Sequence, residues 1–192
     1  MKSKEFISTH KKKILFFFIL ILFLFTLINI VFFVGPGSIV EFLGVENTYA
    51  VIFLIAIFGG VSAFTSTSFY IMFFTFLVGG ANPIPLAIIG GAGLTIGDML
   101  FYYLGSKGRD LTQETKYDTY IEKISKMVEK YSTQIVYLFI YLYTSFSPFP
   151  KDILSIAFGL LHYNIKILFT AMLFGNITHC FVMVLFFSFF VF

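Results

Sequence analysis

Basic residues are confined almost entirely to two short regions of this chain. Of its 13 Lys and Arg residues, five lie in residues 1–13 and six in residues 107–130, whereas residues 14–106 contain none. The chain is 58% hydrophobic and only 12% charged, and soluble domains carry about 25% charged residues. We therefore expect an all-α integral membrane protein whose two basic regions face the cytoplasm.

A long apolar run, Ile14–Val34, follows the basic N-terminus. It is long enough to span a bilayer and longer than the apolar core of a secretory signal peptide. We therefore predict an N-terminal transmembrane helix that is retained, with the N-terminus in the cytoplasm. Residues 35–48 carry two glutamates and no basic residue, as expected of an external segment. We assign these elements to residues 1–48 and the main membrane domain to residues 49–192.

Two apolar stretches are interrupted near their middle. The first, Tyr49–Gly80, is broken by the polar segment GGVSAFTSTSF (Gly59–Phe69). Because each arm is short for a full span, we predict a re-entrant helical hairpin. A single long helix, kinked where hydroxyls bond to their own backbone, is the alternative. The second stretch, Thr133–Leu161, is broken by SPFPKD (Ser147–Asp152).

Each broken stretch is followed by a continuous apolar segment, at about Ile84–Leu104 and Ile165–Phe190. Glycine also closes each hairpin, at Gly79–Gly80 and at Gly159. The charge distribution brings the two halves in from opposite faces. We therefore predict an inverted repeat of a re-entrant hairpin plus a transmembrane helix, an architecture typical of transporters.

Small residues recur within the two predicted spans. Gly97-Asp98 in the first span matches Gly175-Asn176 in the second, and Gly93 with Gly97 forms a small-xxx-small face suited to close helix packing. We expect structural roles for Gly90, Gly93, Gly97, Gly159 and Gly175.

The basic region between the halves has apolar residues at helical spacing. It predicts a cytoplasmic amphipathic helix at 112–131. This helix would lie on the membrane surface or pack beneath the helix bundle.

Charged residues stand at the break of the second hairpin. Pro148 and Pro150 remove two backbone donors, and Lys151 and Asp152 follow directly. A charge within a span costs about 2.5–3.5 kcal/mol on insertion scales and usually marks a functional cavity. We predict such a cavity here; a shallow hairpin tip with both charges at the interface is the alternative. Asp98 either joins this site or has a structural role.

Hydroxyl side chains of the first hairpin, at Ser66, Thr67 and Ser68, are predicted to line the same path. His179 is expected to face the helix bundle, with proton transfer as a second role. Cys180 is the single cysteine, which excludes an intrachain disulfide. No hydrolase, metalloprotease or nucleotide-binding motif is present, so we expect no catalytic residues, metal, cofactor or nucleic-acid partner.

The segments Gly79–Asp110 and Ser145–Asn176 resemble the two signatures of the DedA family, also called the SNARE-associated or VTT-domain family. The first has an Asn-Pro turn, a glycine-rich span with Gly-Asp and a Gly-Arg exit; the second has the proline-broken tip, a glycine and an aromatic turn. The resemblance covers about residues 50–180. The family's two arginines fall on Ser145 and Lys151, and its hairpin glutamate falls among Ser66–Ser68.

This resemblance implies a multi-pass plasma-membrane transporter, a flippase or scramblase that moves a lipid or lipid-linked phosphate between leaflets. Membrane lipids would be its partners, and homo-oligomerisation stays open. Lys151 would hold anionic headgroup oxygens, and Asp152 would orient Lys151 or accept a proton. A non-catalytic membrane-organising protein and a small ion or drug exporter are the alternatives.

Overall fold

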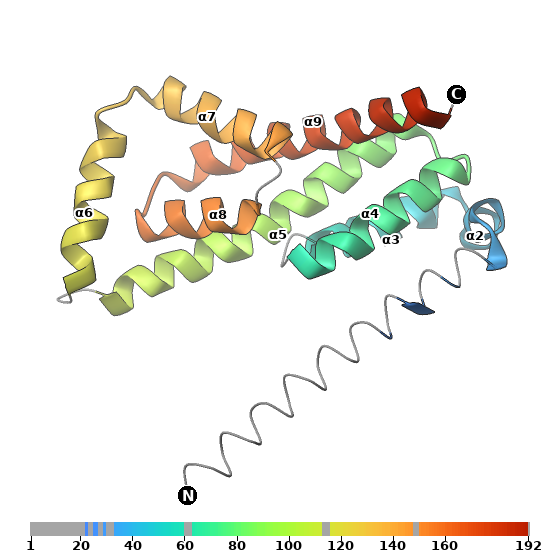
Figure 1. Cartoon of the computed structure of the whole chain (residues 1–192), viewed down its shortest axis with the longest axis horizontal. Helices are drawn as coiled ribbons and strands as arrows, with labels where there is room; N and C mark the ends of the chain where they lie inside the picture. The colour runs from blue at the N-terminus through green and yellow to red at the C-terminus, as the bar shows by residue number, and fades with distance from the viewer. Residues whose placement is uncertain are drawn as a thin grey trace, which may run out of the picture.

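The computed structural model describes residues 33–59, 63–112, 116–147 and 150–191, with residues 22, 25, 26 and 29 of the preceding segment. Most of the predicted N-terminal span and Pro148 lie outside the described residues. Regular structure in the described part is entirely α-helical (Figure 1). The helices are α2 (Pro36–Leu43), α3 (Val45–Gly59), α4 (Ala63–Val78), α5 (Pro83–Thr112), α6 (Lys116–Glu129), α7 (Thr133–Phe146), α8 (Lys151–Leu160) and α9 (Ile165–Val191).

Residues 36–43 form helix α2 where the sequence suggested an external loop. Gly35 and Gly44 flank this helix with φ values of 82° and 77°, a region that glycine adopts without strain. The chain therefore turns sharply at both ends, and α2 and α3 meet at 104°. Pro36 occupies the first turn of α2, where its missing N–H costs no helical hydrogen bond.

Helices α3 and α4 fold back on each other as a hairpin. Ser66 Oγ donates a 2.9 Å hydrogen bond to the carbonyl of Gly59 at the end of α3. Phe69, which is fully buried, packs against the same glycine. This side-by-side arrangement confirms the hairpin and excludes a single kinked helix.

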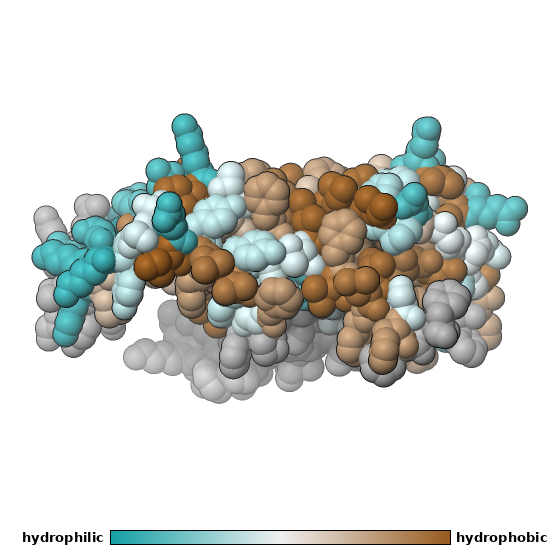
Figure 2. Space-filling view, turned by 90° about the horizontal axis from the view of Figure 1, so that it is seen from above, coloured by the Kyte–Doolittle hydropathy of each residue, from teal (hydrophilic) through white to brown (hydrophobic). Residues whose placement is uncertain are grey.

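Helices α5 and α9 are the long spans, and they run beside each other along the molecule (Figure 1). Pro83–Asp110 and Ile165–Phe189 are each long and apolar enough to cross a membrane, and the bent α2–α3 pair would add a third crossing if it counts as one span. Apolar side chains cover the middle of the face seen in Figure 2, while hydrophilic ones gather toward its two ends. This surface fits a protein surrounded by lipid.

The turns that lead from each hairpin into its long helix have the same backbone. Gly80 and His162 take positive φ values of 92° and 49°. In each turn the next residue donates to the carbonyl five positions earlier, at 3.0 and 3.1 Å. Asn82 and Asn164 then cap the long helices, each accepting a 3.0 Å bond from the backbone N–H two residues later. The two repeats predicted from sequence therefore match at the level of single hydrogen bonds.

These turns also fix the register between the repeats, which differs from the predicted one. Gly93 lies against Ala56 of α3, and Gly175 lies against Thr144 of α7; a Cβ on either glycine would come within 2.6 or 2.7 Å of those side chains. Gly93, and not Gly97, is therefore the counterpart of Gly175. Likewise, the turn residue Gly80 matches His162 and not Gly159.

The second hairpin is more open than the first. Helix α7 packs on α9, whereas α8 packs on α5 of the other repeat. Gly159 of α8 lies against the backbone of Tyr102, and Gly105 of α5 lies against the backbone of Ile156. We refer to this pair of contacts as the α5–α8 glycine seam. It brings the first residue of α8 across to the long helices, where the polar residues lie.

Helix α6 spans residues 116–129, inside the predicted range of 112–131. It crosses the end of the molecule and joins the two repeats (Figure 1). Val128 packs on the core of the second repeat, while Ile124 and Met127 are about half exposed. These exposed apolar side chains could contact a membrane surface. That α6 lies on this surface stays a prediction.

Candidate functional site

One buried amide joins a buried carboxylate to a lysine at the centre of the helix bundle. Asn176 of α9 is fully buried, and its Nδ2 donates to Asp98 Oδ2 at 2.8 Å and to Thr95 Oγ1 at 3.1 Å. Lys151 Nζ donates to Asn176 Oδ1 at 2.8 Å. We call these four residues the Asn176 network; it links α5, α8 and α9, and so both repeats.

Local helix geometry explains how α5 contributes two of these groups. Thr95 and Asp98 are three residues apart and therefore lie on one face of the helix. Thr95 Oγ1 donates to the carbonyl of Gly91 at 2.8 Å, which leaves its lone pairs to accept from Asn176. Gly91 also allows the two long helices to approach closely, because a Cβ there would lie 2.7 Å from Ile177 Cα.

The charges in this network are strongly desolvated. Asp98 is only 2% exposed, and Lys151 is half-buried and also interacts electrostatically with Asp152. A buried charge is tolerated only when hydrogen bonds and an opposite charge compensate it. Asn176 provides this compensation, since its donor end meets the carboxylate and its acceptor end meets the ammonium.

Three more polar residues, His179, Ser145 and Tyr70, lie toward the two hairpins, and we call them the His179 group. His179 lies three residues after Asn176 and so on the same side of the helix. Its Nδ1 is 3.1 Å from the carbonyl of Ser145 in α7, and its Nε2 is 3.3 Å from the hydroxyl of Tyr70 in α4. A carbonyl only accepts, so Nδ1 carries the proton, and in the neutral imidazole Nε2 accepts from Tyr70. The Asn176 network and the His179 group together contain residues of α4, α5, α7, α8 and α9.

The structure brings together two of the predicted path residues, Asp98 and Lys151, through Asn176. Asp152 is half-buried in the first turn of α8, beside Lys151. Pro150 is exposed and precedes α8 as its N-cap residue.

The first hairpin contacts the His179 group through a residue that was not predicted. Ser66 bonds within its own hairpin, Thr67 is exposed and Ser68 is half-buried. Tyr70, one turn beyond Ser66, is the residue that reaches His179.

The predicted structural glycines lie at helix contacts or in the core. Gly93, Gly159 and Gly175 are pressed against neighbouring helices, as described above. Gly90 faces the ring of Phe69, and Gly97 is buried.

Asn176 and Thr95 are the members of the Asn176 network that were not predicted as site residues from the sequence. The signal for Asn176 was the stronger one. Asn176 was noted only as a possible sign of the repeat, although an amide in the middle of an apolar span was itself a signal, since a buried amide requires partners.

Within the described residues, no group of three or more His, Cys, Asp and Glu side chains could hold a metal ion.

Comparison with known proteins places this architecture in a family. The family model of the VTT domain matches residues 48–189, which include both hairpins, both long helices and the Asn176 network. No curated protein and no solved structure matches the chain. The chain therefore belongs to the VTT-domain family of membrane proteins, the DedA or SNARE-associated family.

Proposed function

We propose that this protein is a transporter that moves a lipid or a lipid-linked phosphate between the leaflets of the plasma membrane. The observation that carries the proposal is the Asn176 network, in which Lys151 and the buried Asp98 meet at one amide between two inverted repeats. Inverted repeats with broken helices typically place the transport site at the repeat interface near the midplane.

Lys151 is the group best suited to an anionic headgroup. It is the first residue of α8, so its ammonium lies close to the positive end of the helix dipole. An ammonium has three donors, and the Asn176 bond uses one of them. In this proposal phosphate oxygens bind Lys151 in place of Asn176, and Asp152 orients the lysine or takes up a proton. The hydroxyls of Ser66, Thr67 and Ser68 would line the path from the first hairpin.

The proposed orientation follows from charge. The N-terminus and helix α6 carry most of the basic residues and would face the cytoplasm. Helix α6 would lie along the cytoplasmic surface of the membrane, with Ile124 and Met127 in contact with lipid.

A lipid translocation assay in proteoliposomes tests the proposal. The full chain is reconstituted with a fluorescent phospholipid, and movement between leaflets is followed by chemical quenching of the outer leaflet. Lys151→Ala is expected to slow movement about tenfold or more, because a charge-assisted hydrogen bond contributes about 1.5–3 kcal/mol. Lys166→Ala is the matched control, since Lys166 is an exposed lysine at the start of α9.

The outcomes separate the alternatives. If Lys151→Ala and Asp152→Ala both move lipid at the wild-type rate, the site assignment fails. If the wild-type protein moves no lipid but neutral substitutions at both positions keep its cellular phenotype, a membrane-organising role is favoured instead.

A further inference from the structure

Helices α4 and α8 are equivalent in the two repeats, but they contact the opposite long helix in different ways. Each is the second arm of its hairpin and leads through the matching turn into a long helix. Helix α8 packs closely on α5, whereas the described residues of α4 and α9 show no comparably close packing of their backbones. The structure is therefore asymmetric at a contact that two identical repeats would share.

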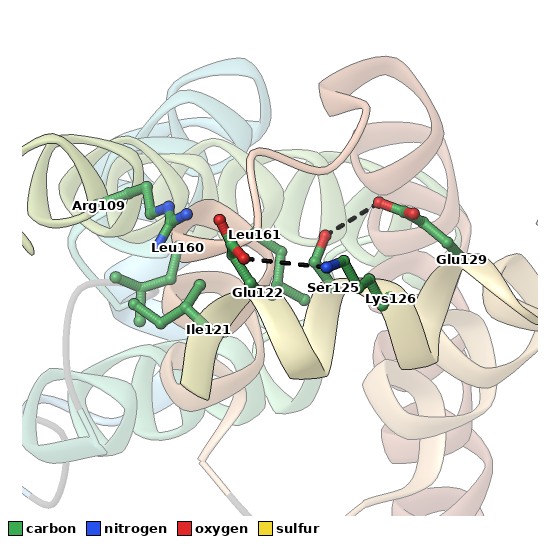
Figure 3. Close-up of a pocket in the computed structure, with 8 residues that line it drawn as sticks. All are labelled: Arg109, Ile121, Glu122, Ser125, Lys126, Glu129, Leu160 and Leu161. Carbon is green, nitrogen blue, oxygen red and sulfur yellow. Dashed lines mark hydrogen bonds and ion pairs between the residues drawn. The ribbon is translucent and has the colours of Figure 1, made fainter. Parts of the chain in front are cut away.

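Helix α8 is anchored to α5 by backbone. In the α5–α8 glycine seam, Gly105 and Gly159 bring the two backbones into direct contact. Tyr102 Oη donates a 2.7 Å hydrogen bond to the carbonyl of Tyr163, in the turn after α8. The end of α8 also borders α6, and a cavity of about 240 Å³ is lined by α5, α6 and this end (Figure 3). Because backbone contacts offer no side chain that can rotate aside, α8 stays with α5.

Aromatic side chains occupy the equivalent contact between α4 and α9. Counted from the matching turns, Phe187 of α9 stands where α5 has Gly105. Phe74 of α4 stands where α8 has Ile156. The ring centres of Phe74 and Phe187 are 5.4 Å apart. Side chains therefore fill the space that backbone occupies in the seam, and side chains can change rotamer.

A single hydrogen bond of the His179 group crosses the same contact. Tyr70 of α4 donates to His179 Nε2 of α9 at 3.3 Å. The imidazole is oriented by its other nitrogen, Nδ1, which is 3.1 Å from the carbonyl of Ser145 in α7. The Tyr70 hydroxyl thus joins the first hairpin to a ring that the second repeat holds in place.

This contact lies directly beside the Asn176 network. His179 is one turn beyond Asn176 on α9 and is close enough to Lys151 to interact with it electrostatically. Tyr70 interacts in the same way with Asp98. Separation of α4 from α9 would therefore uncover the network on the side of the first hairpin.

Contacts near both ends join α4 to its own repeat. Gly79, just after α4, lies against the carbonyl of Pro36 in α2. Ser66, in the first part of α4, donates to the carbonyl of Gly59 at the end of α3. Neither contact involves α9, so α4 can separate from α9 while it remains attached to the first repeat.

We propose that α4 is a gate over the Asn176 network and that the Tyr70–His179 hydrogen bond is the latch that holds this gate closed. When the latch breaks and the rings of Phe74 and Phe187 rotate, α4 separates from α9, while α8 remains on α5. This inference rests on the proposed function in one respect, namely that a transport site must become accessible. Opening of the gate is measured without any transport.

The single cysteine of the chain is a natural reporter for this gate. Cys180 is fully buried, follows His179 directly, and shares a core with Phe69 and Phe73 of α4. Its alkylation therefore requires the contact to open. The purified full chain in detergent is treated with N-ethylmaleimide under native conditions, and labelling is followed by mass spectrometry. Tyr70→Phe should react about three- to tenfold faster than the parent, the factor expected for the loss of one hydrogen bond.

Tyr141→Phe is the matched control. The Tyr141 hydroxyl is 3.1 Å from Thr178 Oγ1 and joins α7 to α9 within the second repeat, where Gly175 already holds these helices together. We expect this variant to react at the parent rate. Equal labelling rates of Tyr70→Phe and Tyr141→Phe would overturn the latch.

Two further comparisons test the gate itself. In a His179→Leu background the latch is already lost, so adding Tyr70→Phe should not increase labelling further; multiplied effects of the two substitutions would contradict the latch. Labelling of the parent and of Tyr70→Phe at the rate of global unfolding, measured in parallel by circular dichroism after addition of denaturant, would overturn the gate. Faster labelling of Tyr70→Phe supports the gate whether or not the protein moves lipid, so the translocation assay decides the proposed function separately.

Discussion

Lys151 donates a 2.8 Å hydrogen bond to Asn176, a residue in the middle of the last long helix. The other end of the same amide donates to Asp98 at 2.8 Å. An amide that uses both ends in this way has one orientation only, because a flip would direct its donors at the ammonium and its acceptor at the carboxylate. The position of the lysine on α8 is therefore coupled to the position of the carboxylate on α5.

Replacing Asn176 by leucine should destabilise the protein by about 3–5 kcal/mol, because it leaves buried charge without compensation. The measurement is thermal unfolding of the full chain in detergent. Asn47→Ala is the control, since the amide of Asn47 is exposed and donates to the carbonyl of Leu43 at the α2–α3 junction, away from the Asn176 network. Equal loss of stability in both variants would contradict the role given to Asn176.

A double-mutant cycle should reveal coupling between Asp98 and Lys151. Asp98→Asn and Lys151→Met each remove one charge and leave the other in a desolvated site, so each alone is destabilising. The double variant should be less destabilised than the sum of the two by about 1–3 kcal/mol. Denaturant or thermal unfolding of the four proteins measures this difference, and strict additivity would show that the shared amide transmits nothing between the two groups.

Gly159→Ala should disrupt the α5–α8 glycine seam. Its Cβ would meet the backbone of Tyr102, which has no flexible end to move aside, so we expect a loss of about 1–3 kcal/mol or more. Gly108→Ala is the control on the same pair of helices, because its Cβ would lie 3.6 Å from Leu160 Cδ2, an ordinary contact. Thermal unfolding should leave Gly108→Ala unchanged or slightly stabilised by its better helix propensity; the reverse order of the two melting temperatures would refute the seam.

Gly80→Ala should destabilise the turn that leads from the first hairpin into α5. The φ of 92° at this position is strained for any residue with a Cβ, and the expected cost is about 1–2 kcal/mol. Gly37→Ala provides the comparison, since a Cβ on Gly37 meets open space and its backbone is helical. Similar unfolding temperatures for the two variants would show that the turn tolerates a side chain, as its counterpart at His162 does.

Hydropathy and charge placement were sufficient to predict both hairpins, both long helices and their inverted arrangement. The register between the repeats was not predictable in the same way. Gly90, Gly93 and Gly97 all recur at helical spacing, so the sequence offers several equivalent alignments with Gly175. Only the packing partner distinguishes them, and Ala56 beside Gly93 matches Thr144 beside Gly175.

The charged residues of the site could be predicted from the sequence, but the hydrogen bonds that join them could not. Lys151 and Asp98 stood out because charges are costly in a span. Asn176 lies 78 residues from Asp98 and 25 from Lys151, and nothing local in the sequence marks that distance as a contact. The same holds for Tyr70, which reaches His179 across 109 residues.

The order of the network along the chain has a consequence for biosynthesis. Asp98 and Lys151 are both translated before Asn176, which comes on the last of the described long helices. Asp98 lies on a helix that is long and apolar enough to cross a membrane, where a charge costs about 2.5–3.5 kcal/mol, and it is made before the amide that compensates it. Until α9 is made, the Asp98 carboxylate needs water or another polar group in place of Asn176, and the synthesis of α9 joins it to Lys151.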